Sequence, residues 1–336
     1  MATSLADDSA LLAELRALAE QGRHHEVLDR LHRLPAPVLE GRTAFALLAA
    51  EAHGRLGDHP EAQRWAELVL LLARSRGERQ AELRALNYKG AIALRHGDVN
   101  QAEGRFADAL MLARTVQDSA AEARGLNNLG IIAFLRGDPA AALADYQLAL
   151  AAYQQAGVVR GIAETHHNIG ISWRDRGDYR RALQAAEQAV RLANELQDDT
   201  LLGLALTGRA ETHLRMGDAE LAAAELTRAA EAYHRVHFEA GLPEVWRLQA
   251  GVARDRGDTA GAIALLEQAA ALATRLASAE ALADVERDLG VALEARGDAA
   301  GARAARRRAV VLYERLGAKH AAQALAALLG DEAAGR

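Results

Sequence analysis

Apolar residues recur along the chain with the spacing of paired amphipathic helices. In the segment "ARGLNNLGIIAFLRGDPAAALADYQLALAAY", Leu129 and Ala133 share one helical face before Gly137, and Ala142 and Tyr146 share another after it. Few segments alternate in the strand pattern or gather Val, Ile, Thr and aromatic residues. The pattern therefore predicts an all-α protein built from helix–turn–helix units.

The helical pattern repeats with a period of 40 residues. A Gly-Asp pair marks the same point of each unit, at Gly57-Asp58, Gly97-Asp98, Gly137-Asp138, Gly177-Asp178, Gly217-Asp218, Gly257-Asp258 and Gly297-Asp298. A fixed period of this length is typical of a solenoid. Two helices of about 16–17 residues with short turns fill one such unit.

The Gly-Asp pairs have a structural explanation. Glycine adopts the left-handed conformation that ends a helix, and aspartate caps the next helix by accepting a bond from a free N–H group. Four copies read Arg-Gly-Asp, a tripeptide often taken as an adhesion signal. The other three have Leu56, His96 or Met216 in place of Arg and keep Gly-Asp. We therefore interpret the tripeptide as a marker of the turn.

The period also predicts the domain organisation. Seven units occupy residues 43–316, and a weaker copy forms an atypical N-terminal hairpin over residues 9–34. Residues 317–330 read as a capping helix that covers the last unit. The sequence further predicts a flexible N-terminus over residues 1–8 and a tail over residues 331–336.

The units resemble the tetratricopeptide repeat family. That family pairs Leu-Gly in the first helix with Ala-x3-Phe/Tyr in the second, and Leu129-Gly130 is followed here by Ala142 and Tyr146. The period exceeds the usual value of about 34, and unit seven has Arg306 where an aromatic residue would pack. The longer unit is similar to the extended repeats of kinesin light chains, spindle-orientation adaptors and bacterial peptide-sensing regulators. The resemblance implies a right-handed superhelical solenoid with a concave groove.

The resemblance places the groove on the first helix of each unit. Counting along that face gives the candidate partner-binding residues Arg84, Asn87, Arg124, Asn127, Asn128, Ile131, Phe134, His167, Asn168, Arg174, Glu211, Arg215 and Arg247. In extended-repeat relatives, asparagines at this place hold the backbone of a bound peptide, which needs both a donor and an acceptor. The alternative is that these asparagines bond between repeats or face solvent. For Ile131 and Phe134 the alternative is ordinary packing between repeats.

Composition narrows the range of chemistry. There is no cysteine, and the formal net charge of −6 argues against a general nucleic-acid binder. The histidines lack the spacing of a metal site, and no phosphate-binding glycine loop or nucleophile motif is found. A basic cluster at Arg303 and residues 306–308 reads as a solvated face or as a site for an anionic partner. We therefore expect no catalytic residues, no metal and no cofactor.

The favoured function is a non-catalytic scaffold or adaptor that binds an extended peptide or a partner helix. The alternative is an intracellular regulator that senses a peptide or other ligand and changes its superhelical pitch. The expected partner is a protein or peptide, with no specific nucleic acid and no membrane insertion, and a homo-oligomer is possible. The acidic N-terminus lacks the charge pattern of a signal peptide, so a cytoplasmic location is expected, in a bacterial protein.

Overall fold

The computed structural model describes residues 5–20, 22–56 and 58–334. Within these residues the chain forms eighteen α-helices, α1 to α18, one short 3₁₀ helix and no strand. The predicted all-α fold of helix hairpins is confirmed. Contacts divide the chain into two compact units, Met1–Leu94 with Asn100–Ala121 and Arg95–Val99 with Glu122–Arg336. Each unit is described by itself.

The first unit contains the N-terminal helices. They are α1 (Leu5–Glu20), α2 (His24–His32), α3 (Ala36–Leu39), α4 (Thr43–Arg55), α5 (His59–Arg76), α6 (Arg79–Arg95) and α7 (Val99–Thr115). The core of this unit includes Leu15, Leu31, Phe45 and Trp65, all nearly inaccessible to solvent.

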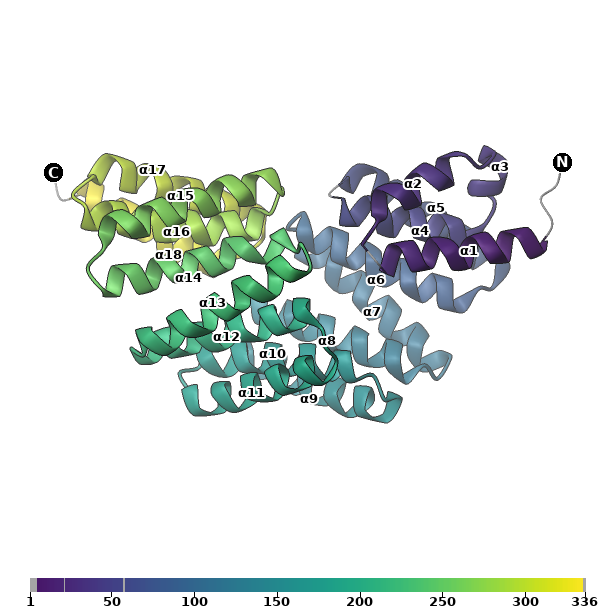
Figure 1. The fold of residues 1–336 in the computed structure, drawn as a ribbon, viewed down its shortest axis with the longest axis horizontal. Helices are drawn as coiled ribbons and strands as arrows, with labels where there is room; N and C mark the ends of the chain where they lie inside the picture. Colours follow the sequence, from purple (N-terminus) through teal and green to yellow (C-terminus); the bar gives the residue numbers. More distant parts are fainter. Residues whose placement is uncertain (1–4, 21, 57, 335–336) are drawn as a thin grey trace. The chain divides into compact units, whose positions relative to one another are not determined.

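The second unit contains the remaining helices in consecutive antiparallel pairs (Figure 1). They are α8 (Ser119–Leu135), α9 (Pro139–Ala156), α10 (Val159–Asp175), α11 (Tyr179–Glu195), α12 (Asp199–Met216), α13 (Ala219–Arg235), η1 (Glu239–Gly241), α14 (Leu242–Asp255), α15 (Thr259–Arg275), α16 (Ala279–Ala295), α17 (Ala299–Arg315) and α18 (Lys319–Ala334). Helices α10, α12, α14 and α16 each pack against the second helix of their own repeat and also contact one another in sequence.

The ends of the helical region differ from the predicted boundaries. Helix α1 already begins at Leu5, ahead of the start expected at residue 9, and α18 continues to Ala334, beyond the end expected at residue 330. Predicted terminal segments 1–8 and 331–336 are therefore partly helical. Their remaining residues, 1–4 and 335–336, lie outside the described residues.

The Gly-Asp turns have the geometry expected of a helix end followed by a cap. Gly97, Gly137, Gly177, Gly217, Gly257 and Gly297 have φ between +77° and +90°, and Gly57 lies outside the described residues. The Asp138 carboxylate accepts a bond from the Ala141 N–H at 2.9 Å, and Asp58, Asp178, Asp258 and Asp298 cap in the same way. Asp218 makes no such bond.

A second series of turns joins one repeat to the next, and the glycine pattern did not predict it. Its left-handed residues also recur every 40 positions, offset by 20 from the first series. They are Gly77, Gln117, Gly157, Gln197, His237, Ala277 and Gly317, with φ between +51° and +70°. Because left-handed backbone costs a non-glycine residue about 1–2 kcal/mol, four of these seven turns are strained.

Small residues let the two helices of a repeat approach closely. A Cβ atom added at Gly130 would lie 2.5 Å from the Tyr146 ring, so only glycine fits there. In the last repeat the Cβ of a residue at Gly290 would meet the aliphatic stem of Arg306 at 2.8 Å. Arg306 therefore packs its stem where other repeats place an aromatic ring. None of the helices described is long and apolar enough to cross a membrane.

Candidate functional site

One position of the first helix, repeated every 40 residues, organises the site in the second unit. Its occupants are Asn127, His167, Thr207, Arg247 and Arg287. The residue 41 positions later lies on the next first helix and is Asn168, Gly208, Leu248 or Asp288. The Asn127 and Arg247 positions contact these later residues directly, Asn168 and Asp288 respectively. Equivalent positions of the repeat thus hold amide side chains near the start of the second unit and charged side chains further along the chain.

The neutral part, here called the amide stretch, consists of Asn127, Thr165 and Asn168. The Asn127 Oδ1 atom accepts a hydrogen bond from Asn168 Nδ2 at 3.1 Å and lies 3.2 Å from the Thr165 hydroxyl. Asn127 is only 9% exposed, whereas Asn168 is partly buried. Asn127 therefore bonds to Asn168 of the next repeat, which is one of the two alternatives for the asparagines.

His167 lies between the two parts and packs against a glycine. A Cβ atom at Gly208 would lie 2.9 Å from the imidazole, so the glycine makes room for the ring. Burial, helped by the nearby Arg174 charge and opposed by Glu244, lowers the pKa of His167 to about 4. The imidazole is therefore neutral at pH 7.

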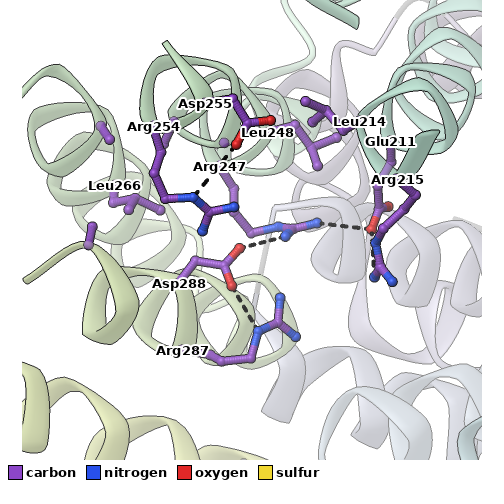
Figure 2. Close-up of a pocket in the computed structure, with 14 residues that line it drawn as sticks. Glu211, Leu214, Arg215, Arg247, Leu248, Arg254, Asp255, Leu266, Arg287 and Asp288 are labelled. Carbon is purple, nitrogen blue, oxygen red and sulfur yellow. Dashed lines mark hydrogen bonds and ion pairs between the residues drawn. The ribbon is translucent and has the colours of Figure 1, made fainter. Parts of the chain in front are cut away.

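The charged part, here called the ion-pair chain, runs through α10, α12, α14 and α16. Arg174 Nη1 lies 2.7 Å from Glu211 Oε2, and Glu211 Oε1 lies 3.7 Å from Arg247 Nη2. Arg247 donates to Asp288 at 2.7 Å, and Asp288 also accepts from Arg287 Nε at 2.8 Å. Figure 2 shows how Arg247 lies between Glu211 and Asp288. The chain connects four consecutive first helices through alternating charges.

Arg247 is the centre of this chain. It is 8% exposed and makes a two-pronged pair with Glu244 at 2.8 and 2.6 Å, in addition to its bond to Asp288. Burial would lower the pKa of Arg247, but Glu244, Asp288 and Glu211 outweigh it and raise that pKa. Burial likewise opposes ionisation of Asp288, yet Arg247 and Arg287 lower its pKa. These groups therefore remain charged at neutral pH.

A cavity of about 430 Å³ opens beside the ion-pair chain. One part of its wall is apolar and another carries charges (Figure 2). The lining residues are Glu211, Leu214, Arg215, Arg247, Leu248, Ala250, Gly251, Arg254, Asp255, Ala262, Leu266, Arg287, Asp288 and Ala292. A volume of this size suits a small organic ligand or a few residues of a peptide.

The structure brings together part of the predicted groove. Glu211, Arg215 and Arg247 line the cavity, and Arg174 contacts Glu211 at its edge. Leu248, Gly251 and Arg254 of α14 complete the wall between the charged residues. This cluster is therefore the candidate site.

The other predicted groove residues lie elsewhere. Arg84 and Asn87 are on α6 in the first unit, where the Asn87 amide donates to the Leu83 carbonyl of its own helix at 3.0 Å. Arg124 is exposed on α8, and Asn128 is partly buried on the same helix. Ile131 and Phe134 pack against an apolar cluster that includes Leu143, Tyr146 and Ile169. For Ile131 and Phe134 this is the contact that ordinary packing between repeats would give.

Sequence reasoning missed Asp288, which lines the cavity. Asp288 receives bonds from both Arg247 and Arg287, and the Tyr313 hydroxyl donates to Asp284 at 2.6 Å while it accepts from Arg287 at 3.0 Å. Asp288 occupies the same repeat position as Asn168, three units further along. That shared register was the signal that could have identified it.

Two arginines of the basic cluster in the last repeat contact carboxylates of α16. Arg308 makes a two-pronged pair with Glu286 at 2.7 Å, and Arg306 is buried and contacts Glu294. Arg306 thus differs from both sequence interpretations of the cluster, since it neither faces solvent nor presents an open anion site. Across the described parts of the chain, no group of three or more His, Asp or Glu side chains is placed to hold a metal ion.

Comparison with known families identifies the repeat. Residues 121–195 match the tetratricopeptide repeat family model. The repeats in this segment are similar to tetratricopeptide repeats. No curated protein sequence matches the chain closely enough to count as a relative. The 40-residue register of the Gly-Asp pairs continues beyond the matched segment to the last repeat.

Three solved structures with low sequence identity share the tetratricopeptide fold of this chain. A Rap protein complexed with the competence and sporulation factor has 14% identity, a TM-score of 0.62 and coverage of 96% of both chains. The Rap conjugation gene regulator of plasmid pLS20, in complex with the Phr* peptide, has 15% identity, a TM-score of 0.69 and coverage of 82% of this chain and 74% of that one. NprR with its cognate peptide NprX has 14% identity, a TM-score of 0.59 and coverage of 96% and 99%.

Proposed function

We propose that this tetratricopeptide repeat protein is a non-catalytic peptide-binding adaptor whose site is the cavity beside the ion-pair chain. The observation that carries the proposal is a cavity of about 430 Å³ that is lined by three consecutive first helices and by α15, and is bordered by both guanidinium and carboxylate groups. Such a surface offers donors and acceptors together with apolar contacts, as an extended peptide requires. All three similar structures named above are described as complexes with a factor or peptide.

A binding role agrees better with the cavity than a catalytic one. Its lining residues carry no hydroxyl, thiol or imidazole group, and Asp288 and Glu211 are held in ion pairs. A nucleophile with an adjacent base, the usual requirement of covalent catalysis, does not assemble there. The remaining groove predictions, Arg84, Asn87, Arg124, Asn128 and His167 among them, extend this proposal along the first helices.

A cavity-filling substitution tests the proposal. Gly251 lines the cavity, and a Cβ atom there would meet only Leu214 at an ordinary 3.6 Å, so Gly251→Leu fills the space without a backbone clash. Gly104→Leu is the matched control, because nothing lies within 4 Å of a Cβ atom at that helical position. A display library of short random peptides is selected against each variant.

The selection distinguishes the outcomes clearly. We expect the wild type and Gly104→Leu to enrich the same peptides and Gly251→Leu to lose them, with affinities checked by fluorescence anisotropy. Equal enrichment by Gly251→Leu would place the binding site elsewhere. Failure of every folded variant to enrich any peptide would reject the peptide-binding function.

The second candidate is a peptide-sensing regulator. One similar structure is described as a conjugation gene regulator in complex with a peptide, and here the ion-pair chain connects four first helices beside the cavity. A sensor should change its radius of gyration when saturated with a selected peptide, measured by small-angle X-ray scattering. An unchanged radius of gyration at saturation would reject the regulator function and would be consistent with the adaptor function. A cytoplasmic location in a bacterium remains part of this proposal.

A further inference from the structure

The four arginines that line the cavity differ in how closely they contact neighbouring carboxylates. Arg247 and Arg287 each donate to carboxylates at 2.8 Å or less. Arg254 Nε lies 3.9 Å from Asp255 Oδ1, and Arg215 Nη2 lies 3.6 Å from Glu211 Oε1. Both of these separations exceed the length of a hydrogen bond. Arg215 and Arg254 therefore reach the cavity with donors that their neighbouring carboxylates leave unused.

The carboxylate nearest Arg215 is already engaged, and the one nearest Arg254 makes only a long contact. Glu211 binds Arg174 at 2.7 Å, which leaves Arg215 only the longer contact. The Arg215 and Arg254 side chains are 54% and 45% exposed, whereas Arg247 is 8% exposed. Their guanidinium groups can thus turn toward a ligand without breaking a close ion pair.

The charge of the lining favours an anion. Four guanidinium groups and three carboxylates line the cavity, which gives a net charge of +1, although the whole chain carries −6. Guanidinium groups bind carboxylates through two parallel bonds, and a partly enclosed site strengthens such bonds relative to water. A local positive site on a negative protein distinguishes one anionic group of a ligand from the rest of its surface.

The cavity also has an apolar wall. Leu248 and Leu266 line the same cavity as Arg254, and both leucines are buried. With Leu214 they offer a surface for an aliphatic side chain in the cavity that the Arg254 guanidinium borders. The ligand group that fits both features carries a carboxylate adjacent to an apolar side chain.

We propose that the cavity binds a peptide through a carboxylate held by Arg254, with Arg215 as a second cation and an adjacent apolar side chain against Leu248 and Leu266. This inference rests on the peptide-binding function proposed above and adds its chemical specificity. The carboxylate can be the α-carboxylate of a C-terminal apolar residue or the side chain of an internal Asp or Glu next to one. The test separates these two sources.

Three random peptide libraries provide the probes. The first has a free carboxyl terminus, the second has the same composition with an amidated terminus, and the third is amidated and lacks Asp and Glu. Each library is selected against the wild type, Arg254→Gln, Arg215→Gln and the control Arg228→Gln. Arg228 has a similarly exposed side chain and a similarly long 3.7 Å contact to Glu225, but it does not line the cavity.

Carboxylate-bearing peptides should bind the wild type at least about tenfold more tightly than their carboxylate-free counterparts, as expected for one charge-assisted contact. Arg254→Gln should remove this preference, Arg215→Gln should weaken it, and Arg228→Gln should leave it unchanged. Preference for the first library over the second identifies a C-terminal carboxylate, and equal binding of these two identifies an acidic side chain. Equal binding of all three libraries would overturn the carboxylate site alone, whereas absence of any binder would overturn peptide binding itself.

Discussion

Two contacts in the second unit have the same repeat geometry and different chemistry. Asn127 binds Asn168 and Arg247 binds Asp288, and in both pairs the partner is 41 residues further along the chain. Asn168 donates one neutral hydrogen bond to Asn127 at 3.1 Å. Arg247 donates a charged hydrogen bond to Asp288 at 2.7 Å and also binds Glu244. The fold specifies which two positions are in contact, and the residue types at those positions decide how much the contact contributes to stability.

The two contacts should respond very differently to loss of one partner. A neutral hydrogen bond contributes about 0.5–1.5 kcal/mol net, because water replaces it in the unfolded chain. A buried ion pair can contribute almost nothing to stability as a whole. Removing one member is nevertheless costly, because it leaves the other charge buried and uncompensated. The charged contact is therefore the one that a single substitution damages most.

The largest effect is expected for Arg247→Met. The substitution keeps an unbranched side chain in the space but leaves Glu244, Asp288 and Glu211 without their shared cation. We expect a loss of about 3–5 kcal/mol in the free energy of unfolding, the range for a broken buried pair. Urea denaturation followed by circular dichroism measures it.

Arg256→Met is the matched control for Arg247→Met. Arg256 makes an ion pair of the same 2.7 Å length with Glu220, but both side chains are at least half exposed. Exposed pairs contribute about 0–1 kcal/mol, so the control should change stability little. Equal losses in the two variants would show that burial of Arg247 does not set the value of its contacts.

A smaller effect is expected for Asn127→Ala. Thr165 keeps its bond to the Gly161 carbonyl at 2.7 Å, and partly buried Asn168 can turn to water, so little is left unsatisfied. We expect a loss of about 1 kcal/mol, the net value of a neutral bond. Asn194→Ala is the control, because the Asn194 amide bonds only within its own helix, to the Val190 carbonyl.

Subtracting the Asn194→Ala value removes the gain in helix propensity that both alanines bring. The difference between the two variants then reports the bond between repeats. A difference indistinguishable from zero would mean that the amide stretch adds nothing to repeat stacking. A loss as large as that of Arg247→Met would remove the distinction between neutral and charged contacts altogether.

The sequence predicted the repeat register and one series of left-handed turns, but it did not predict the second series. The Gly-Asp register specified the helix pairs and one series of turns, because glycine is the residue that a left-handed position favours. The second series was not predicted, since Gln117, Gln197, His237 and Ala277 adopt positive φ without that signal. In each of these turns the N–H of the next residue bonds to a carbonyl five positions back, as Asp118 does to Ala113 at 2.9 Å, which closes the helix without a glycine.

The candidate site was predictable only in part. Helical spacing placed Glu211, Arg215 and Arg247 on one face, and they line one cavity. Spacing could not tell which charges would pair closely, because that depends on helix separation and side-chain rotamers. The loose contact of Arg254 and the two bonds of Asp288 are visible only in three dimensions.

The last effect, similar in size to that of Asn127→Ala, tests His167, the residue between the two contacts. Its pKa is about 4 in the folded protein and near 6.5 in the unfolded chain. As the pH falls through 6.5, the unfolded chain binds a proton that the folded protein does not accept until about pH 4, so stability declines over this window. The full shift would correspond to about 3 kcal/mol. We expect about 1 kcal/mol, because the ring is partly exposed and solvent screens it.

His167→Asn should therefore lose less stability than the wild type between pH 7 and pH 4.5, by about 1 kcal/mol. Urea denaturation at the two pH values measures the difference, and His320→Asn, at an exposed position, is the control for removal of a histidine. Parallel loss of stability in His167→Asn and the wild type would contradict burial of a neutral ring against Gly208.

A stronger pH dependence in His167→Asn would reverse the sign of the effect and would mean that the folded state favours the protonated imidazole. The Arg174 charge beside the ring argues for the first sign, since a guanidinium repels an added proton at His167.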